Sequence, residues 1–187
     1  MRVAKEITDT SSSASLRRSE LGRDLVNAAY LRGDFVLSSG LRSSYYFDKY
    51  LFETKPGILR RVAAMIATMV PASADRLGGP ELGAVALTTA VSLGTGLPFV
   101  ILRKQSKEYG TSRSFEGELY KRERVVVIED VLTTGGEAIR AANTVTQAGA
   151  EVLLIIAVID REQGAQENLA AAGFKSKALF TRTELGL

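Results

Sequence analysis

The second half of the chain alternates between short, unbroken apolar runs and segments in which apolar residues recur every three or four positions. Unbroken apolar runs are typical of strands buried on both faces, and the wider spacing is typical of helices packed on one side. The predicted strands are 76–79, 98–103, 124–130, 151–160 and 178–180. The predicted helices are 83–92, 136–149 and 166–172. This alternation predicts an α/β fold, in which helices flank both faces of a parallel sheet.

The first third of the chain has a different pattern. Residues 1–15 are polar and rich in serine, so we expect them to be poorly ordered. An amphipathic helix is predicted over 16–31, followed by two short strands, 35–40 and 45–50, and a helix over 58–70.

This change of pattern predicts the domain organisation. We expect residues 16–187 to form a single domain. Within it, about 16–52 would form a small N-terminal subdomain of one helix and two strands.

The composition restricts the chemistry that the chain can perform. The apolar fraction of 45% and the charged fraction of 24%, over 187 residues, are ordinary for a globular protein. Cysteine and histidine are both absent, which excludes disulfides, Cys/His zinc sites and an imidazole general base. Catalysis would therefore use carboxylates, lysine, arginine, hydroxyls, backbone amides or a hard metal ion.

Charge and hydropathy give no reason to expect nucleic acid or a membrane as a partner. Lysine and arginine total 24 against 21 acids, and a net charge of +3 is too small to indicate nucleic-acid binding. No apolar run reaches the roughly 20 residues that span a bilayer, and no signal peptide is visible. We therefore expect a cytoplasmic protein.

Two adjacent carboxylates, Glu129 and Asp130, end one apolar run and are followed by Thr-Thr-Gly-Gly at 133–136. In an open parallel sheet, ligands bind beyond the carboxyl ends of the strands. The helix that follows the glycines offers free N–H groups and a positive dipole end to an anion. Acids that bind vicinal hydroxyls beside such an anion site suit a sugar phosphate. Alternatively, the acids cap the following helix and TTGG is an ordinary turn.

A polar segment at 104–122 follows another predicted strand and has no apolar periodicity. Four cations fall within eleven residues at its start: Arg103, Lys104, Lys107 and Arg113. They predict either a loop that closes over a polyanion or a solvated surface loop. Loops of this length are uncommon unless they are functional or disordered.

The stretch VVVIEDVLTTGGEA at 125–138 resembles the phosphoribosyl-pyrophosphate (PRPP) motif of type I phosphoribosyltransferases. The resemblance implies the fold of that family, a parallel sheet flanked by helices with a small N-terminal hood subdomain. It also implies that PRPP is bound by Glu129, Asp130, Val131, Leu132, Thr133, Thr134, Gly135, Gly136, Glu137 and Ala138.

Three further segments are similar to orotate phosphoribosyltransferases. RKQSKEYGTSR at 103–113 resembles their catalytic loop, and FVLSSGLRSSYYFD at 35–48 resembles their orotate-binding segment. VIDREQGAQENL at 158–169 resembles the segment whose arginine, here Arg161, holds the orotate carboxylate. A guanidinium suits a carboxylate because it donates two parallel hydrogen bonds. Taken separately, YYF also fits a core strand, and Arg161 also fits a surface charge.

The resemblance implies transfer of ribose 5-phosphate from PRPP to orotate, giving orotidine 5′-monophosphate and pyrophosphate. It implies Mg²⁺ held mainly through PRPP and water, with no direct protein ligand, and a homodimer that shares the loop 103–118. The implied catalytic residues are Lys107, Asp130 and Glu129. The other implied contacts are Arg103, Lys104, Lys107 and Tyr109 for PRPP, and Ser38, Tyr46, Phe47, Thr133 and Arg161 for orotate.

The sequence departs from the family pattern at four places. Ser38 stands where many members have a lysine, Tyr109 stands where some have histidine, and GGPELGAV at 78–85 lacks a lysine often found there. Glu137 adds an acid at the end of the phosphate loop, where it would weaken phosphate binding if it faced inward. We expect it to point outward along the first helical turn, where the helix dipole favours an acid.

Two other functions stay open. A regulator that senses PRPP without catalysis would keep EDVLTTGG but would need neither the cationic loop nor the orotate segments. A transferase for another nucleobase would keep the PRPP motif but would have no use for YYFD and DREQG. Association with a decarboxylase is also left open.

Overall fold

The computed structural model describes residues 2–36, 42–104 and 114–187. The chain divides into two compact units, Met1–Ile58 (unit 1) and Leu59–Leu187 (unit 2). The boundary lies close to the position, about residue 53, at which the sequence pattern changes. That 16–187 acts as a single domain stays a prediction.

Unit 1 consists of a helix, a hairpin and a short helical turn. Its elements are α1 (Arg2–Ala29), β1 (Tyr30–Val36), β2 (Arg42–Phe47), α2 (Tyr50–Glu53) and the first residues of α3 (Pro56–Ala67). β1 and β2 pair antiparallel. Leu21, Leu25 and Ala29 recur every four residues on α1 and are fully buried, which is the spacing expected for the packed face of a helix.

The element bounds in unit 1 differ from the sequence pattern in three respects. β1 covers Tyr30–Val36 rather than 35–40, and the helix before it accordingly ends at Ala29 rather than at residue 31. β2 ends at Phe47 rather than continuing to residue 50, because the Asp48 side chain accepts the Tyr50 N–H at 3.0 Å and starts the turn of α2. In addition, α1 begins at Arg2, whereas the apolar pattern begins at residue 16. The expectation that residues 1–15 are poorly ordered in solution stays a prediction.

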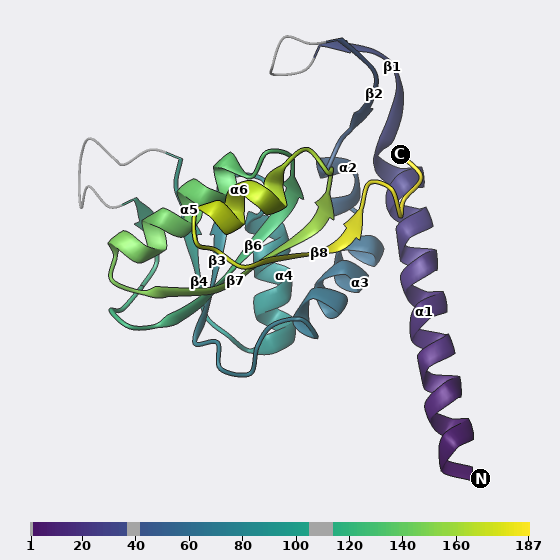
Figure 1. Cartoon of the computed structure of the whole chain (residues 1–187), viewed down its shortest axis with the longest axis horizontal. Coiled ribbons are helices and arrows are strands. Elements are labelled where there is room, and N and C mark those ends of the chain that lie inside the picture. The colour runs from purple at the N-terminus through teal and green to yellow at the C-terminus, as the bar shows by residue number, and fades with distance from the viewer. Residues whose placement is uncertain (1, 37–41, 105–113) are drawn as a thin grey trace. The chain divides into compact units, whose positions relative to one another are not determined.

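Unit 2 contains a six-stranded sheet with the order β5-β4-β3-β6-β7-β8. Its strands are β3 (Arg76–Pro80), β4 (Phe99–Leu102), β5 (Phe115–Glu116), β6 (Arg124–Leu132), β7 (Glu151–Asp160) and β8 (Ser176–Thr181). Its helices, after the greater part of α3, are α4 (Val85–Thr95), α5 (Gly136–Gln147) and α6 (Ala165–Ala171). All neighbouring strands are parallel except β5, which is antiparallel to β4. Figure 1 shows α5 and α6 on one face of the sheet and α4 on the other, so the predicted α/β fold is confirmed.

The core beneath α5 shows how the sequence builds this layer. Val125 and Val127 of β6 and Ile155 and Ala157 of β7 alternate along their strands and face the same side. They pack against a face of α5 made largely of alanine, which allows the helix to lie close to the sheet. The residues of this face are Ala138, Ala141, Ala142 and Val145. β6, which lies between β3 and β7 in the sheet, carries Glu129 and Asp130 near its carboxyl end.

One element of unit 2 was not expected. The sequence predicts no strand between Lys104 and Arg122, but Phe115 and Glu116 form β5 and pair with Leu102 and Ile101 of β4. A strand of two residues is too short to show an alternating pattern. Its formation depends on the neighbouring strand rather than on local sequence.

Among the described residues, no helix is both long and apolar enough to cross a membrane.

Candidate functional site

The acid pair lies at the carboxyl end of β6, the strand between β3 and β7. Glu129 is only 5% exposed and Asp130 only 2%. The Asp130 N–H donates to Glu129 Oε1 at 3.0 Å, and the Val131 N–H donates to Asp130 Oδ1 at 2.5 Å. Burial of two adjacent carboxylates costs free energy of folding. If the pair had only a structural role, its contacts within the protein would have to offset that cost.

The acid pair does not supply the N-cap residue of α5. The N-cap of α5 is Gly135, in the left-handed conformation at φ 82°, and no side chain caps the helix there. The N-cap position is thus filled by a glycine and not by an acid, and both acids precede it by at least five residues.

The Thr/Gly segment forms the wall of a pocket of about 420 Å³ at the start of α5. The residues that line it are Glu129, Val131, Leu132, Thr133, Thr134, Gly135, Gly136, Glu137, Ala138 and Arg140. Glu129 and the Thr/Gly segment at 133–136 thus line the same pocket, as a sugar-phosphate site requires. This segment, together with the first residues of α5, is called the phosphate loop below. The helix N-terminus beside it favours an anion.

Glu137 lies in the first turn of α5 and its side chain is 54% exposed. Its carboxylate pairs with Arg140 in the next turn and lies 3.7 Å from Lys104 Nζ. Glu137 also lines the pocket, so the expectation that its side chain points outward stays a prediction. Two cations offset its charge, so its repulsion toward a bound phosphate is reduced.

The base of the cationic loop lies at the edge of the sheet formed by β4 and β5. The Arg103 N–H donates to the Ser114 carbonyl at 2.9 Å, which closes the loop between them. The Arg103 guanidinium lies 3.3 Å from Glu116 and 3.7 Å from Glu81. The Lys104 N–H also donates to Glu81, at 2.9 Å. Lys107 and Tyr109 lie outside the described residues, so their roles stay predictions.

Arg161 directly follows β7, at the same edge of the sheet as the acid pair. Its N–H donates to the Leu132 carbonyl, the last residue of β6, at 2.8 Å. The preceding Asp160 is buried and accepts hydrogen bonds from the Glu162 N–H at 2.8 Å and from Gln166 Nε2 at 2.9 Å. The segment that carries Arg161 is therefore tied to the strand that carries the phosphate loop.

The residues predicted to contact orotate from the N-terminal region belong to unit 1. Tyr46 lies on β2, is 42% exposed, and has its ring centroid 5.7 Å from that of Phe35. Phe47 is buried, with its ring 6.2 Å from Phe52, as expected for an aromatic core strand. Ser38 lies outside the described residues. These orotate contacts stay predictions.

The acid pair belongs to no larger cluster of possible metal ligands. In the parts of the chain that the structure describes, no group of three or more acidic side chains could hold a metal ion. The donor set of Glu129 and Asp130 consists of hard carboxylate oxygens. Such a pair suits a cation that keeps most of its water or substrate ligands, as Mg²⁺ does.

Three residues that the sequence analysis did not assign border the site. They are Glu81, which holds both Arg103 and Lys104; Arg140, which pairs with Glu137; and Asn168, whose side chain donates to the Thr134 carbonyl at 2.9 Å. The spacing i, i+3 from Glu137 to Arg140 was a visible signal. Asn168 is an exposed residue of α6 next to the buried Leu169, so no local sequence pattern marked it as a contact of this segment.

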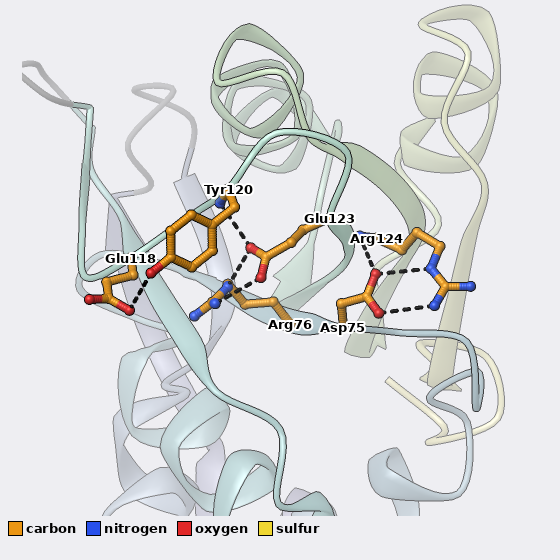
Figure 2. A network of polar contacts seen from close by, with 6 residues as sticks. All are labelled: Asp75, Arg76, Glu118, Tyr120, Glu123 and Arg124. Atoms are coloured by element: carbon orange, nitrogen blue, oxygen red, sulfur yellow. Dashed lines mark hydrogen bonds and ion pairs between the residues drawn. The ribbon is translucent and has the colours of Figure 1, made fainter.

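The opposite, amino edge of the sheet holds a separate polar network (Figure 2). Arg76 Nε and Nη2 donate to the two carboxylate oxygens of Glu123 at 2.8 and 2.9 Å. Arg124 binds Asp75 in the same two-pronged manner, with both distances 2.9 Å. Hydrogen bonds from the Arg124 side chain and amide lower the pKa of Asp75 to about 2.

The same network shifts the pKa values of two further groups, Glu123 and Tyr120. The hydrogen bonds from Arg76 lower the pKa of the Glu123 carboxyl below its usual range. The Tyr120 hydroxyl donates to Glu118 at 2.9 Å, and this bond to a carboxylate raises the pKa of Tyr120. The carboxylates of Asp75 and Glu123 are thus bound by arginines within the protein.

Comparison with known proteins agrees with the geometry. The family model of the phosphoribosyl transferase domain matches residues 52–177. An orotate phosphoribosyltransferase from Methanocella arvoryzae is 44% identical over 82% of this chain and 87% of its own length. One from Pyrococcus horikoshii is 43% identical over 90% of this chain and 92% of its own.

Solved structures give the same result. The orotate phosphoribosyltransferase of Mycobacterium tuberculosis, in complex with Fe(III) dicitrate, superposes with a TM-score of 0.82 at 30% identity. That comparison covers 91% of this chain and 99% of the other. The same enzyme in complex with PRPP superposes with a TM-score of 0.77 at 29% identity, over 91% and 99% of the two chains. The chain therefore belongs to the phosphoribosyltransferase family and, within it, to the orotate phosphoribosyltransferases.

Proposed function

We propose that this protein transfers ribose 5-phosphate from PRPP to orotate, giving orotidine 5′-monophosphate and pyrophosphate. The observation that carries the proposal is the buried pair Glu129 and Asp130, at the end of a central strand and next to the Thr/Gly pocket. Family membership supplies the substrates, and the local geometry supplies a place for the sugar and its phosphate.

In this mechanism the bond between the anomeric carbon and pyrophosphate breaks as a bond to a ring nitrogen of orotate forms. The anomeric carbon gains positive character during the exchange. Glu129 and Asp130 accept hydrogen bonds from the ribose 2′- and 3′-hydroxyls and place negative charge near that carbon. Preorganised charge of this kind typically contributes a few kcal/mol to transition-state stabilisation.

The phosphate loop holds the 5′-phosphate. Thr133 and Thr134 donate from their hydroxyls, and the amides from Gly135 to Ala138 donate from the first turn of α5. Glycine at 135 and 136 lets the backbone approach the phosphate oxygens closely. Thr133 would also contact orotate.

Cations of the 103–118 loop neutralise the departing pyrophosphate. Arg103 and Lys104 stand at the base of this loop, and Lys107 is the residue that we expect to have the largest catalytic effect. Tyr109 would contact PRPP from the same loop. In a homodimer this loop would serve the partner's site.

Arg161 binds the orotate carboxylate, and Ser38, Tyr46 and Phe47 are the other residues that we expect to contact orotate. Orotate enters already ionised at its nucleophilic nitrogen, so no general base is needed. This agrees with a chain that contains no histidine.

Mg²⁺ would be held mainly by PRPP and water, with the carboxylates of Glu129 and Asp130 close to the ribose oxygens. It supplies charge neutralisation to the pyrophosphate group. A cytoplasmic location and a homodimer also belong to this proposal.

The test is an assay of base specificity. Protein, Mg²⁺, PRPP and orotate are mixed and the loss of orotate absorbance is followed, with adenine, hypoxanthine and uracil in parallel. We expect consumption of orotate alone, with one pyrophosphate released per orotate. Binding of PRPP without consumption of any base would instead identify a PRPP-sensing regulator, and use of another base would identify a different transferase.

A further inference from the structure

Helix α6 contacts the phosphate loop at two neighbouring residues. Asn168 Nδ2 donates a hydrogen bond of 2.9 Å to the carbonyl oxygen of Thr134. At the next residue, a Cβ added to Gly135 would lie 3.3 Å from both the Ala165 carbonyl oxygen and Leu169 Cγ. Because Gly135 also has a φ of 82°, another residue would be strained there. The loop therefore rests directly on α6.

The hydrogen bond from Asn168 fixes the orientation of one peptide group. In a trans peptide the carbonyl and the following N–H point in opposite directions. Since the Thr134 carbonyl points toward α6, the Gly135 N–H points away from α6. Gly135 itself lines the pocket, and the described lining comes from residues 129–140 with none from α6, so the pocket does not open on the α6 side of the loop.

Helix α6 is itself well anchored. Asp160 accepts hydrogen bonds from the Glu162 N–H and from Gln166 Nε2, and the Gln166 side chain accepts one from Ser176 Oγ at 2.7 Å. Leu169 is fully buried in the core beneath α5. The backbone of Asn168 is therefore held in place by the contacts of α6, although its side chain lies at the surface.

We propose that Asn168 is a positioning residue for the 5′-phosphate of PRPP. Its amide holds the Thr134 carbonyl on the α6 side, and thereby aims the Gly135 N–H into the phosphate pocket. Asn168 touches neither substrate and acts only through the loop. This inference rests on the proposed function, because it assigns the pocket to the 5′-phosphate.

The test compares three variants in the orotate assay. Asn168→Asp keeps the size of the side chain but replaces the donor with a carboxylate that repels the Thr134 carbonyl. Loss of one hydrogen bond is worth about 1 kcal/mol, so we expect KM for PRPP to rise about fivefold or more while KM for orotate changes less than twofold. Asn168→Gln retains the amide donor and should recover part of the loss. Glu167→Ala, at the adjacent exposed position, serves as the matched control and should leave both KM values unchanged.

A second measurement separates this inference from the proposed function. Inorganic phosphate should raise the Tm of the wild-type protein, and the rise should be smaller for Asn168→Asp. If no orotate is consumed by the wild type but this difference persists, the proposed function fails and the positioning role stands. A lower Tm with unchanged KM for PRPP and an unchanged phosphate-induced rise would show that Asn168 is only structural, and would overturn the inference.

Discussion

The two edges of the sheet in unit 2 both carry acids, but they hold them differently. At the amino edge, Glu123 and Asp75 each face an arginine that donates two hydrogen bonds to the carboxylate (Figure 2). At the carboxyl edge, Glu129 and Asp130 accept hydrogen bonds from the amides of the residues that follow them, beside a pocket. A carboxylate bound by a guanidinium stabilises the fold, whereas carboxylates held by local backbone beside a pocket are placed to receive hydroxyl groups of a ligand.

Exposure alone would not separate the two kinds of acid. The side chain of Glu123 is 19% exposed and that of its partner Arg76 is 8% exposed, so this pair is also largely buried. The surrounding structure distinguishes the edges: the strands start at one, whereas strand ends, glycines and a helix N-terminus lie at the other. The following variants test whether residues at the carboxyl edge mainly affect activity and residues at the amino edge mainly affect stability.

The largest expected effect is on turnover at the carboxyl edge. Asp130→Asn removes a charge that the proposed mechanism places near the anomeric carbon, and we expect turnover to fall about 100-fold, the scale of one preorganised electrostatic contact. The Tm should hold or rise, because the variant removes a buried charge. Steady-state kinetics and thermal unfolding measure the two quantities. The matched control is the same chemical change at the amino edge, Asp75→Asn, which should leave turnover unchanged; a normal rate for Asp130→Asn would remove the acid pair from the mechanism.

The next effect is on stability at the amino edge. Arg76→Ala leaves Glu123 partly buried without its arginine, and we expect a loss of about 2–3 kcal/mol in the free energy of unfolding. Urea unfolding measures this loss, and KM and kcat at permissive temperature should change less than twofold. Lys177→Ala, which removes an exposed cation from β8, should have little effect on stability. If Arg76→Ala lost activity while keeping its stability, the separation of the two edges would be wrong.

A smaller effect concerns the pH dependence of stability. Because the pKa of Asp75 is lowered from 3.8 to about 2 in the folded protein, its contribution is complete above pH 4. The contribution is lost as the pH falls from about 4 toward 2, because Asp75 takes up a proton first in the unfolded chain and then, near pH 2, in the folded protein. We therefore expect the wild type to have a higher Tm than Asp75→Asn at neutral pH, and the difference to shrink over that range. A difference that stayed constant down to pH 2 would show that the Asp75 charge is not involved.

The smallest effect is expected at Glu137. Glu137→Ser removes an acid that lines the pocket and releases Arg140 and Lys104 toward a bound phosphate. Because the carboxylate is about half exposed, we expect KM for PRPP to fall only about two- to threefold. Glu167→Ser, which removes an acid from the first turn of α6, is the matched control. An increase in KM would mean instead that the ion pairs of Glu137 support the phosphate loop.

The sequence by itself determined the parts of the molecule that depend on local pattern. The apolar run of β6, the glycine-bounded helix α5 and the acid pair between them could be located because periodicity, turn chemistry and strand ends are all local properties. The same segment pointed to a sugar-phosphate pocket, and the motifs in chain order pointed to the orotate phosphoribosyltransferases.

Only the tertiary structure decided which distant residues meet. The ion pair of Arg76 and Glu123 joins positions 47 residues apart, and the hydrogen bond from Asn168 to Thr134 joins positions 34 apart. Strand β5 likewise exists because β4 lies beside it. No local pattern encodes such contacts, since they arise from the order of strands in the sheet and the packing of helices on its faces. The sequence therefore placed the carboxylates and the glycines of the site, and the fold placed the residues that hold them in position.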